Sequence, residues 1–152
     1  MAIYWPSDLV RCGLPAVDPY QLQFLATLNA LHDSYRRANM AEQLLSTLLF
    51  LDDYGAHCFQ AEETLMREHA YPELSQHRAE HVAFYRDVQA FKISLIVDGA
   101  SERLAWRLYG RLCPWLVEHI VLADRKLGRF INGQTRHAAG GNPLKTPDRV
   151  PG

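Results

Sequence analysis

ELSQHRAEHVAFYRDVQAFKISLIV, residues 73–97, carries apolar residues at every third or fourth position. That spacing places side chains on one face of an α-helix. Two histidines, His77 and His81, fall on the same face as Phe84 and Val88, where a helix that packs in a core should be apolar. The segment therefore predicts a long helix that buries imidazole groups among apolar side chains.

The same helical period extends over most of the chain. The predicted helices cover about residues 19–37, 41–69, 73–97 and 101–133. Four helices of this length with short connections pack most simply as an up-down-up-down bundle. We therefore expect an all-α fold, a four-helix bundle over residues 1–133.

Several residues mark where the helices should begin, end or bend. Asp18 reads as an N-cap with Pro19 at the first helical position, and Ser101 reads as the cap of the last helix. Pro114 lies well inside that helix, so we expect a kink or a break there. Residues 134–152 are polar and rich in glycine and proline, which predicts a disordered tail.

Composition bounds the class of protein. The chain has 152 residues and a mass of 17.4 kDa, with sixteen basic and seventeen acidic residues. A net charge near zero gives no electrostatic reason to expect nucleic acid or an anionic membrane as partner. The three cysteines show no zinc-finger or disulfide spacing, and we find no signal peptide and no apolar run of the ~20 residues that a membrane span needs. We expect a soluble, cytoplasmic protein.

Polar residues lie on the core-facing stripes of three predicted helices. These are Glu62 on the second helix, His77 and His81 on the third, and His119 on the fourth. A buried glutamate needs a partner, and no lysine or arginine lies on these stripes at that level. Imidazole and carboxylate groups suit iron, zinc or manganese, so the pattern favours a metal site. The remaining histidines are interpreted as structural or exposed: His32, His57, His69 and His137.

Asp124 follows His119 by five residues. On an ideal α-helix the two side chains would lie ~140° apart, so spacing alone does not pair them. A single π-type turn would bring them to the same side, and such turns occur at functional sites. We state this π-turn as a hypothesis.

The chain resembles the hemerythrin family, particularly bacterial hemerythrins, over about residues 5–131. The matching text is Trp5, GLPAVD (13–18), LNAL (28–31), DY...CF..EETLM (53–66), YPEL..H...H..F (71–84) and WLVEHI...D (115–124), where dots stand for positions that do not carry the match. The last three segments, in this order and spacing, carry most of the resemblance. It implies a four-helix bundle that holds two iron ions, bridged by two carboxylates and an oxo or hydroxo group.

Residue by residue, the resemblance assigns most of the ligands. His77, His81 and His119 correspond to the three histidines of the first iron, and Glu62 and Asp124 to the bridging carboxylates. The second iron, which binds dioxygen in the family, has two histidine ligands. Those two positions are occupied here by Gln21 and Cys58.

Two readings of these replacements stay open. Gln21 and Cys58 could serve as unusual ligands of a second iron, or Cys58 could be core filler. The first reading predicts a modified di-iron site that binds dioxygen or a related small ligand for storage, transport or sensing, and we take it as the main expectation. The alternative is a mononuclear metal protein that has lost dioxygen carriage, and a metal-free scaffold is a third possibility. We expect no enzymatic activity, and protein partners and oligomeric state stay open.

Overall fold

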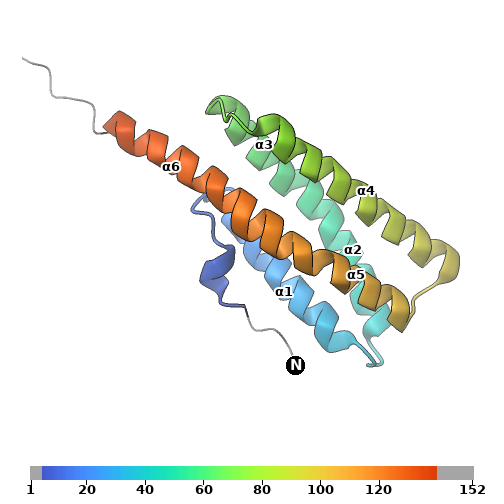
Figure 1. The fold of residues 1–152 in the computed structure, drawn as a ribbon. Helices are drawn as coiled ribbons and strands as arrows, with labels where there is room; N and C mark the ends of the chain where they lie inside the picture. The colour runs from blue at the N-terminus through green and yellow to red at the C-terminus, as the bar shows by residue number, and fades with distance from the viewer. Residues whose placement is uncertain (1–4, 140–152) are drawn as a thin grey trace, which may run out of the picture.

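The computed structural model describes residues 5–139, with side chains described as far as residue 134. Four helical rods run alongside one another (Figure 1). The first two rods are α1 (Asp18–Ser34), preceded by the 3-10 helix η1 (Ser7–Val10), and the continuous run α2 (Met40–Asp53), η2 (Tyr54–Cys58) and α3 (Phe59–Glu68). The other two are α4 (Leu74–Asp98) and the run α5 (Glu102–Pro114), η3 (Trp115–Asp124) and α6 (Arg125–Ala139). Both η2 and η3 are π-helices.

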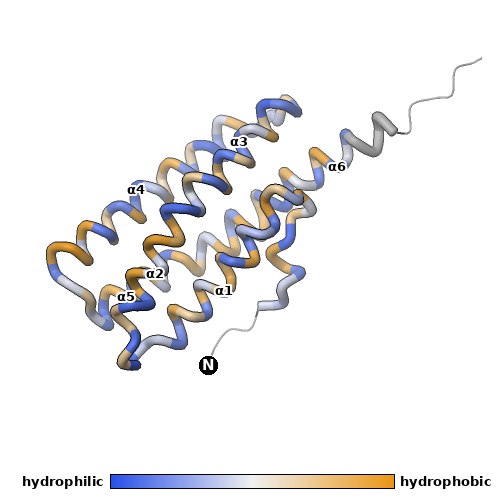
Figure 2. Tube along the Cα trace, turned by 180° about the vertical axis from the view of Figure 1, so that it is seen from behind, coloured by the Kyte–Doolittle hydropathy of each residue, from blue (hydrophilic) through white to orange (hydrophobic). Residues whose placement is uncertain are grey.

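Each rod contacts at least two others. The first rod packs on α2 and α5, and α4 packs on α2, α3 and α5, so the four rods enclose one core. Hydrophobic and hydrophilic residues alternate along every rod (Figure 2), as expected for helices with one buried face. The all-α, four-helix bundle expected from the sequence is confirmed. Within residues 5–139, no helix is long and apolar enough to cross a membrane.

The core has an apolar part and a polar part. Fully buried leucine and phenylalanine side chains fill the bundle on the side of the α1–α2 and α4–α5 connections: Phe24, Leu28, Leu31, Leu44, Leu48, Leu108 and Leu112. Five charged or titratable side chains are equally buried at the level of α3 and η3: Glu62, His77, His81, His119 and Asp124. Buried groups of this kind need mutual partners or a cation.

The helix starts show one expected cap and one different arrangement. Ser101 accepts a hydrogen bond from the backbone N–H of Leu104 at 3.0 Å, which confirms it as an N-cap. Asp18 is itself the first residue of α1, and its carboxylate instead accepts the backbone N–H groups of Cys12 (2.7 Å) and Gly13. Its side chain therefore fixes the loop before the helix, while Pro19 occupies the first turn as expected.

The fourth rod differs from expectation at two points. Pro114 does not break the helix: α5 ends there and η3 continues directly in the wider π register. A change of register at this point suits proline, which has no N–H for the carbonyl one α-turn earlier. The rod also continues beyond Gly133 as far as the described residues reach, so residues 134–139 are helical where a disordered tail was predicted. The rest of that predicted tail, 140–152, lies outside the described residues.

The segment before α1 lies against the fourth rod. A Cβ atom at Gly128 would lie 1.8 Å from the carbonyl oxygen of Cys12, so α6 needs glycine at this close approach. The Arg125 guanidinium also donates to the backbone carbonyls of Asp8 and Leu9, at 3.2 and 2.7 Å. These contacts hold the N-terminal segment against the rod that carries His119 and Asp124.

Candidate metal centre

Five side chains from three rods converge at the polar level of the core. Each contributes one potential ligand atom, and these atoms all lie within 4.8 Å of one another: Glu62, His77, His81, His119 and Asp124. All five are buried, with between 0% and 4% of their surface exposed. The structure therefore brings together the four residues whose types and faces suggested a metal site, and Asp124, which the family resemblance added.

Helical geometry explains why the ligand atoms meet. His77 and His81 are four apart on α4, so they lie one above the other on one face. His119 and Asp124 are five apart, and both lie in η3. A π-helix pairs its backbone groups five residues apart, so these two side chains also share a face. The π-turn hypothesis is confirmed, although the π-helical stretch spans ten residues and not one turn.

Two of the imidazoles are oriented by carboxylates on their outer sides. Nδ1 of His81 lies 2.9 Å from the carboxylate of Glu63, and Nδ1 of His119 lies 2.7 Å from that of Glu80. Because a carboxylate only accepts, each Nδ1 carries the donated proton. In the neutral rings, the Nε2 atoms then present lone pairs inward, yet they face each other at 3.2 Å. A shared cation would accept both Nε2 lone pairs and remove their mutual repulsion. A carboxylate that accepts the outer N–H group is the typical support of a metal-bound histidine.

Aromatic rings fix the same two imidazoles from the sides. Phe59 stacks on His81 with ring centroids 3.9 Å apart, and Trp115 stacks on His119 at 3.8 Å. Phe84 in turn stacks on Trp115 at 4.1 Å. These contacts restrict ring rotation and exclude water from one side of the cluster.

The two buried carboxylates find only imidazoles as charged partners among the described residues. Oε2 of Glu62 lies 2.8 Å from Nε2 of His81 and 3.1 Å from that of His77. Oδ1 of Asp124 lies 3.1 Å from Nε2 of His119 and 3.2 Å from that of His77. No hydrogen bond of acceptable geometry reaches this Oδ1, which makes it a buried oxygen with spare lone pairs at the centre of the cluster.

The mutual contacts perturb the pKa values of these groups. Burial alone would raise the pKa of Glu62, but the adjacent imidazoles of His119, His77 and His81 outweigh it and lower that pKa well below its usual range. Burial opposes the charged form of His77, yet the adjacent carboxylates of Asp124 and Glu62 raise its pKa to about 9. The pKa of His119 is raised in the same way, mainly by the charge of Asp124 acting against burial. The imidazoles and carboxylates therefore stabilise each other's charged forms.

Gln21 and Cys58 lie beside this cluster and are fully buried. The Gln21 amide nitrogen donates to Oδ2 of Asp124 at 2.5 Å. The Cys58 thiol donates to Oε1 of Glu62 at 3.3 Å. Burial, together with the charges of Glu62 and Asp124, raises the pKa of Cys58 far above its usual range. Both side chains therefore stand next to the carboxylates as hydrogen-bond donors.

Sequence reasoning missed the residues that support the ligands. Tyr54 donates its hydroxyl to the Gln21 amide oxygen at 3.4 Å, and Trp115 donates its indole N–H to the Tyr54 oxygen at 3.3 Å. Glu63 and Glu80 were missed as well. Glu63, Tyr54 and Trp115 are among the matching residues of the family resemblance, which was the available signal for them. Glu80 lies within the matching segment 71–84 but is not one of its matching residues, so its place beside His81 was the weaker signal.

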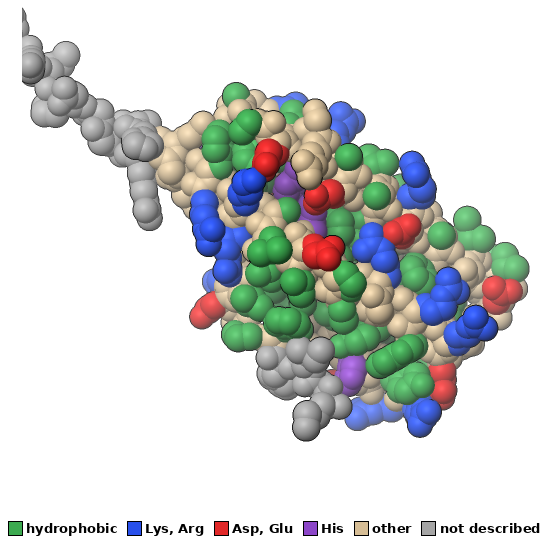
Figure 3. Space-filling view, in the orientation of Figure 1, with side chains coloured by type: hydrophobic (Ala, Val, Ile, Leu, Met, Phe, Trp, Pro, Cys, Tyr) green, Lys and Arg blue, Asp and Glu red, His purple; other side chains and the backbone are tan. Residues whose placement is uncertain are grey.

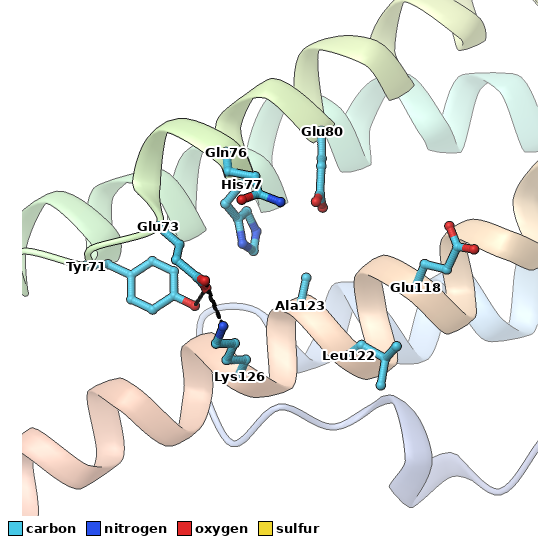
Figure 4. Close-up of a pocket in the computed structure, with 9 residues that line it drawn as sticks. All are labelled: Tyr71, Glu73, Gln76, His77, Glu80, Glu118, Leu122, Ala123 and Lys126. Atoms are coloured by element: carbon cyan, nitrogen blue, oxygen red, sulfur yellow. Dashed lines mark hydrogen bonds and ion pairs between the residues drawn. The ribbon is translucent and has the colours of Figure 1, made fainter.

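A surface hollow leads toward the cluster. It has a volume of about 220 Å³ and lies between α4 and the fourth rod, with His77 at its floor. Figure 4 shows His77 reaching from α4 toward Ala123, with Glu80 beside it and Glu118 on the opposite rod. On this face, histidine atoms are visible among acidic side chains (Figure 3). A second hollow of about 240 Å³ reaches His119 past the same two glutamates.

The other described histidines lie away from the centre. His32 contacts Asp33, the exposed His57 pairs with Asp53, and His69 bonds Gln134. This agrees with their interpretation as structural or exposed residues. His137 was interpreted in the same way, but its side chain lies outside the described part of the chain.

The fold and the site together indicate a class of cation-binding helical bundle. A four-helix bundle with three buried histidines and two buried carboxylates, one oxygen of which lacks a hydrogen bond, suits a hard or borderline cation. Residues 20–131 match the family model described as the hemerythrin HHE cation binding domain. The chain belongs to the hemerythrin family.

Curated relatives agree with this assignment. The chain is 29% identical over 118 residues to a bacteriohemerythrin of Pseudomonas paraeruginosa, covering 78% of this chain and 74% of the relative. It is equally similar, 29% over 118 residues, to a bacteriohemerythrin of Pseudomonas aeruginosa. A bacteriohemerythrin of Stenotrophomonas maltophilia is 27% identical over 147 residues, 91% of each chain. The expected family is therefore confirmed.

Proposed function

We propose that this protein binds iron through Glu62, His77, His81, His119 and Asp124 and presents it to dioxygen or a related small ligand, as a binding protein and not as an enzyme. The observation that carries the proposal is the convergence of five buried ligand atoms within 4.8 Å. The match to a cation binding domain supports a metal, and the family resemblance described above implies that the metal is iron. Iron bound there would supply a redox-active centre, and five protein donors leave one position of a six-coordinate ion for an external ligand.

Charge supports the need for a cation. Two carboxylates are buried in the cluster, and their charged partners among the described residues are all imidazoles. Without a cation, these imidazoles must hold protons to balance the carboxylates, as the raised pKa values of His77 and His119 indicate. A divalent ion would take over that role and release the protons.

The surroundings support binding of a small ligand. The hollows at His77 and His119 open between Glu80 and Glu118, which gives a cation an acidic approach to the cluster. On its inner side the cluster is closed by Phe59, Phe84 and Trp115. Binding against such an apolar wall costs less free energy for a small uncharged molecule than for a charged one. The unpaired thiols of the described residues, among them the buried Cys12 and Cys58, suit a reducing compartment, so we place this function in the cytoplasm.

Metal content and absorption spectra test the proposal. Wild-type protein supplied with Fe(II) without oxygen should retain iron through gel filtration, and its spectrum should change on exposure to air and revert on removal of oxygen. The variant His119→Ala should lose the iron, whereas His57→Ala, which removes an exposed imidazole, should keep it. A wild type that retains no iron would refute the proposed function. Steady consumption of oxygen in place of a reversible change would refute the binding role and favour an enzyme.

A further inference from the structure

We propose that Gln21 and Cys58 close the α1 and η2 side of the centre with hydrogen bonds, so that the chain holds one metal ion and not two. This inference rests on the proposed function, because it concerns how many ions the same cluster takes. Its basis is the way in which Glu62 and Asp124 divide their oxygen atoms between the two sides of the centre.

One oxygen of each carboxylate faces the histidines. Oε2 of Glu62 lies within 3.1 Å of two imidazole nitrogens, and Oδ1 of Asp124 lies within 3.2 Å of two. Together with the three Nε2 atoms, these oxygens form the five-atom cluster within 4.8 Å. This side therefore offers a complete ligand set for one ion.

The other oxygen of each carboxylate is already engaged. Oε1 of Glu62 accepts the thiol of Cys58 at 3.3 Å, and Oδ2 of Asp124 accepts the amide of Gln21 at 2.5 Å. A second ion bridged by the same carboxylates would need these two outer oxygens as ligands. In the structure, an S–H and an N–H group occupy the places next to them.

The orientation of the Gln21 amide is set by a chain of donors. The indole of Trp115 donates to the hydroxyl of Tyr54, and that hydroxyl donates to the amide oxygen of Gln21. The amide oxygen is thereby turned toward Tyr54, and the NH₂ group is turned toward Asp124. An amide NH₂ group is a donor without a lone pair for a metal, so in this orientation Gln21 cannot serve as a ligand.

Turning the amide over would break this chain at both ends. The Tyr54 hydroxyl would face an NH₂ group, and Asp124 would face an amide oxygen, with no water to compensate because Gln21 and Tyr54 are fully buried. Ligation by Cys58 would likewise break its hydrogen bond to Oε1 of Glu62, the oxygen that a second ion would also need. Both changes oppose a second ion at this place.

Counting ions tests the inference directly. Metal-free wild type, saturated anaerobically with Fe(II) and passed through gel filtration, should retain one ion per chain by elemental analysis. The double variant Gln21→His/Cys58→His replaces both donors with imidazoles and should retain two. The control Gln60→His adds an imidazole at an exposed position two residues from Cys58 and should stay at one.

The thiol gives a second measurement on the wild type itself. The infrared S–H stretching band of Cys58, identified by its absence in Cys58→Ala, should persist when metal binds. Two ions per wild-type chain, loss of this band on metal binding, or a folded double variant that still retains one ion would each overturn the inference. Zero ions per wild-type chain would instead refute the proposed function, so the two failures give different readings.

Discussion

The two sides of the metal centre satisfy their polar groups in opposite ways. On the side of α1 and η2, each donor meets one acceptor, from Trp115 through Tyr54 and Gln21 to Asp124. On the side of α4 and η3, two imidazole nitrogens face each other, and a carboxylate oxygen lacks a hydrogen bond. A side that is internally satisfied is structural, whereas a side with unmet lone pairs requires an external cation.

Metal removal should produce the largest difference between the two sides. At a free metal concentration about a thousand times Kd, binding stabilises the fold by about 4.1 kcal/mol. For a chain of this size, chelation should then lower Tm by roughly 8 to 16 °C. We expect amide hydrogen exchange to increase in α4 and η3 and to change little in α1 and η2. Calorimetry measures the change in Tm, and mass spectrometry measures the exchange. An unchanged Tm, or increased exchange confined to α1, would contradict the proposed difference between the two sides of the centre.

Loss of an outer carboxylate should produce a smaller effect. Replacing Glu80 with glutamine removes the carboxylate that orients His119, and such changes weaken metal affinity about 10- to 100-fold. The control Glu118→Gln alters a glutamate of the same hollow that forms no ion pair within the described residues, and it should bind within about threefold of wild type. Competition titrations with a chelator of known affinity measure both. Equal losses in the two variants would show that the hollow acts only through its total charge.

Proton release should give the smallest and most gradual effect. The pKa of His77 is raised from 6.5 to about 9 in the metal-free fold, so its contribution to stability is complete below pH 6.5 and is lost as pH rises through 9. Metal needs the neutral ring, so apparent affinity should increase with pH over the same interval, by at most about tenfold per pH unit for each released proton. Calorimetry in buffers of different ionisation enthalpy counts these protons. Affinity that is constant between pH 6.5 and 9 would contradict the exchange of protons for metal.

Sequence patterns predicted much of the fold and the ligand side of the centre. Faces repeated every three or four residues identified the rods, because each face depends on one helix at a time. The spacing between His119 and Asp124 did not pair them by itself; the family resemblance assigned Asp124 its role, and the π-turn was the hypothesis that reconciled the two. The second π-helix, η2, has no such ligand pair to indicate it, and it was not expected.

Features that depend on several rods could not be predicted. The donor role of Gln21 is set by Tyr54 and Trp115, which come from two other rods. Glu80 lies beside His81 in sequence but supports His119 across the bundle. The end of the fourth rod was placed too early, because the polar residues 134–139 resemble a tail although they continue the helix.

The π-helical geometry of η3 ties the length of the fourth rod to the spacing of its two ligands. Side chains share a face when they are four apart in an α-helix and five apart in a π-helix. A chain that lost one residue between His119 and Asp124 could relax to an α-helix and still direct both side chains to the same point. The same deletion between Arg125 and Leu127, where the helix is already α-helical, would rotate the residues after it by about 100° and turn Gly128 away from Cys12. The four positions between the two ligands are therefore places where natural or engineered variants can shorten the chain without dismantling the centre.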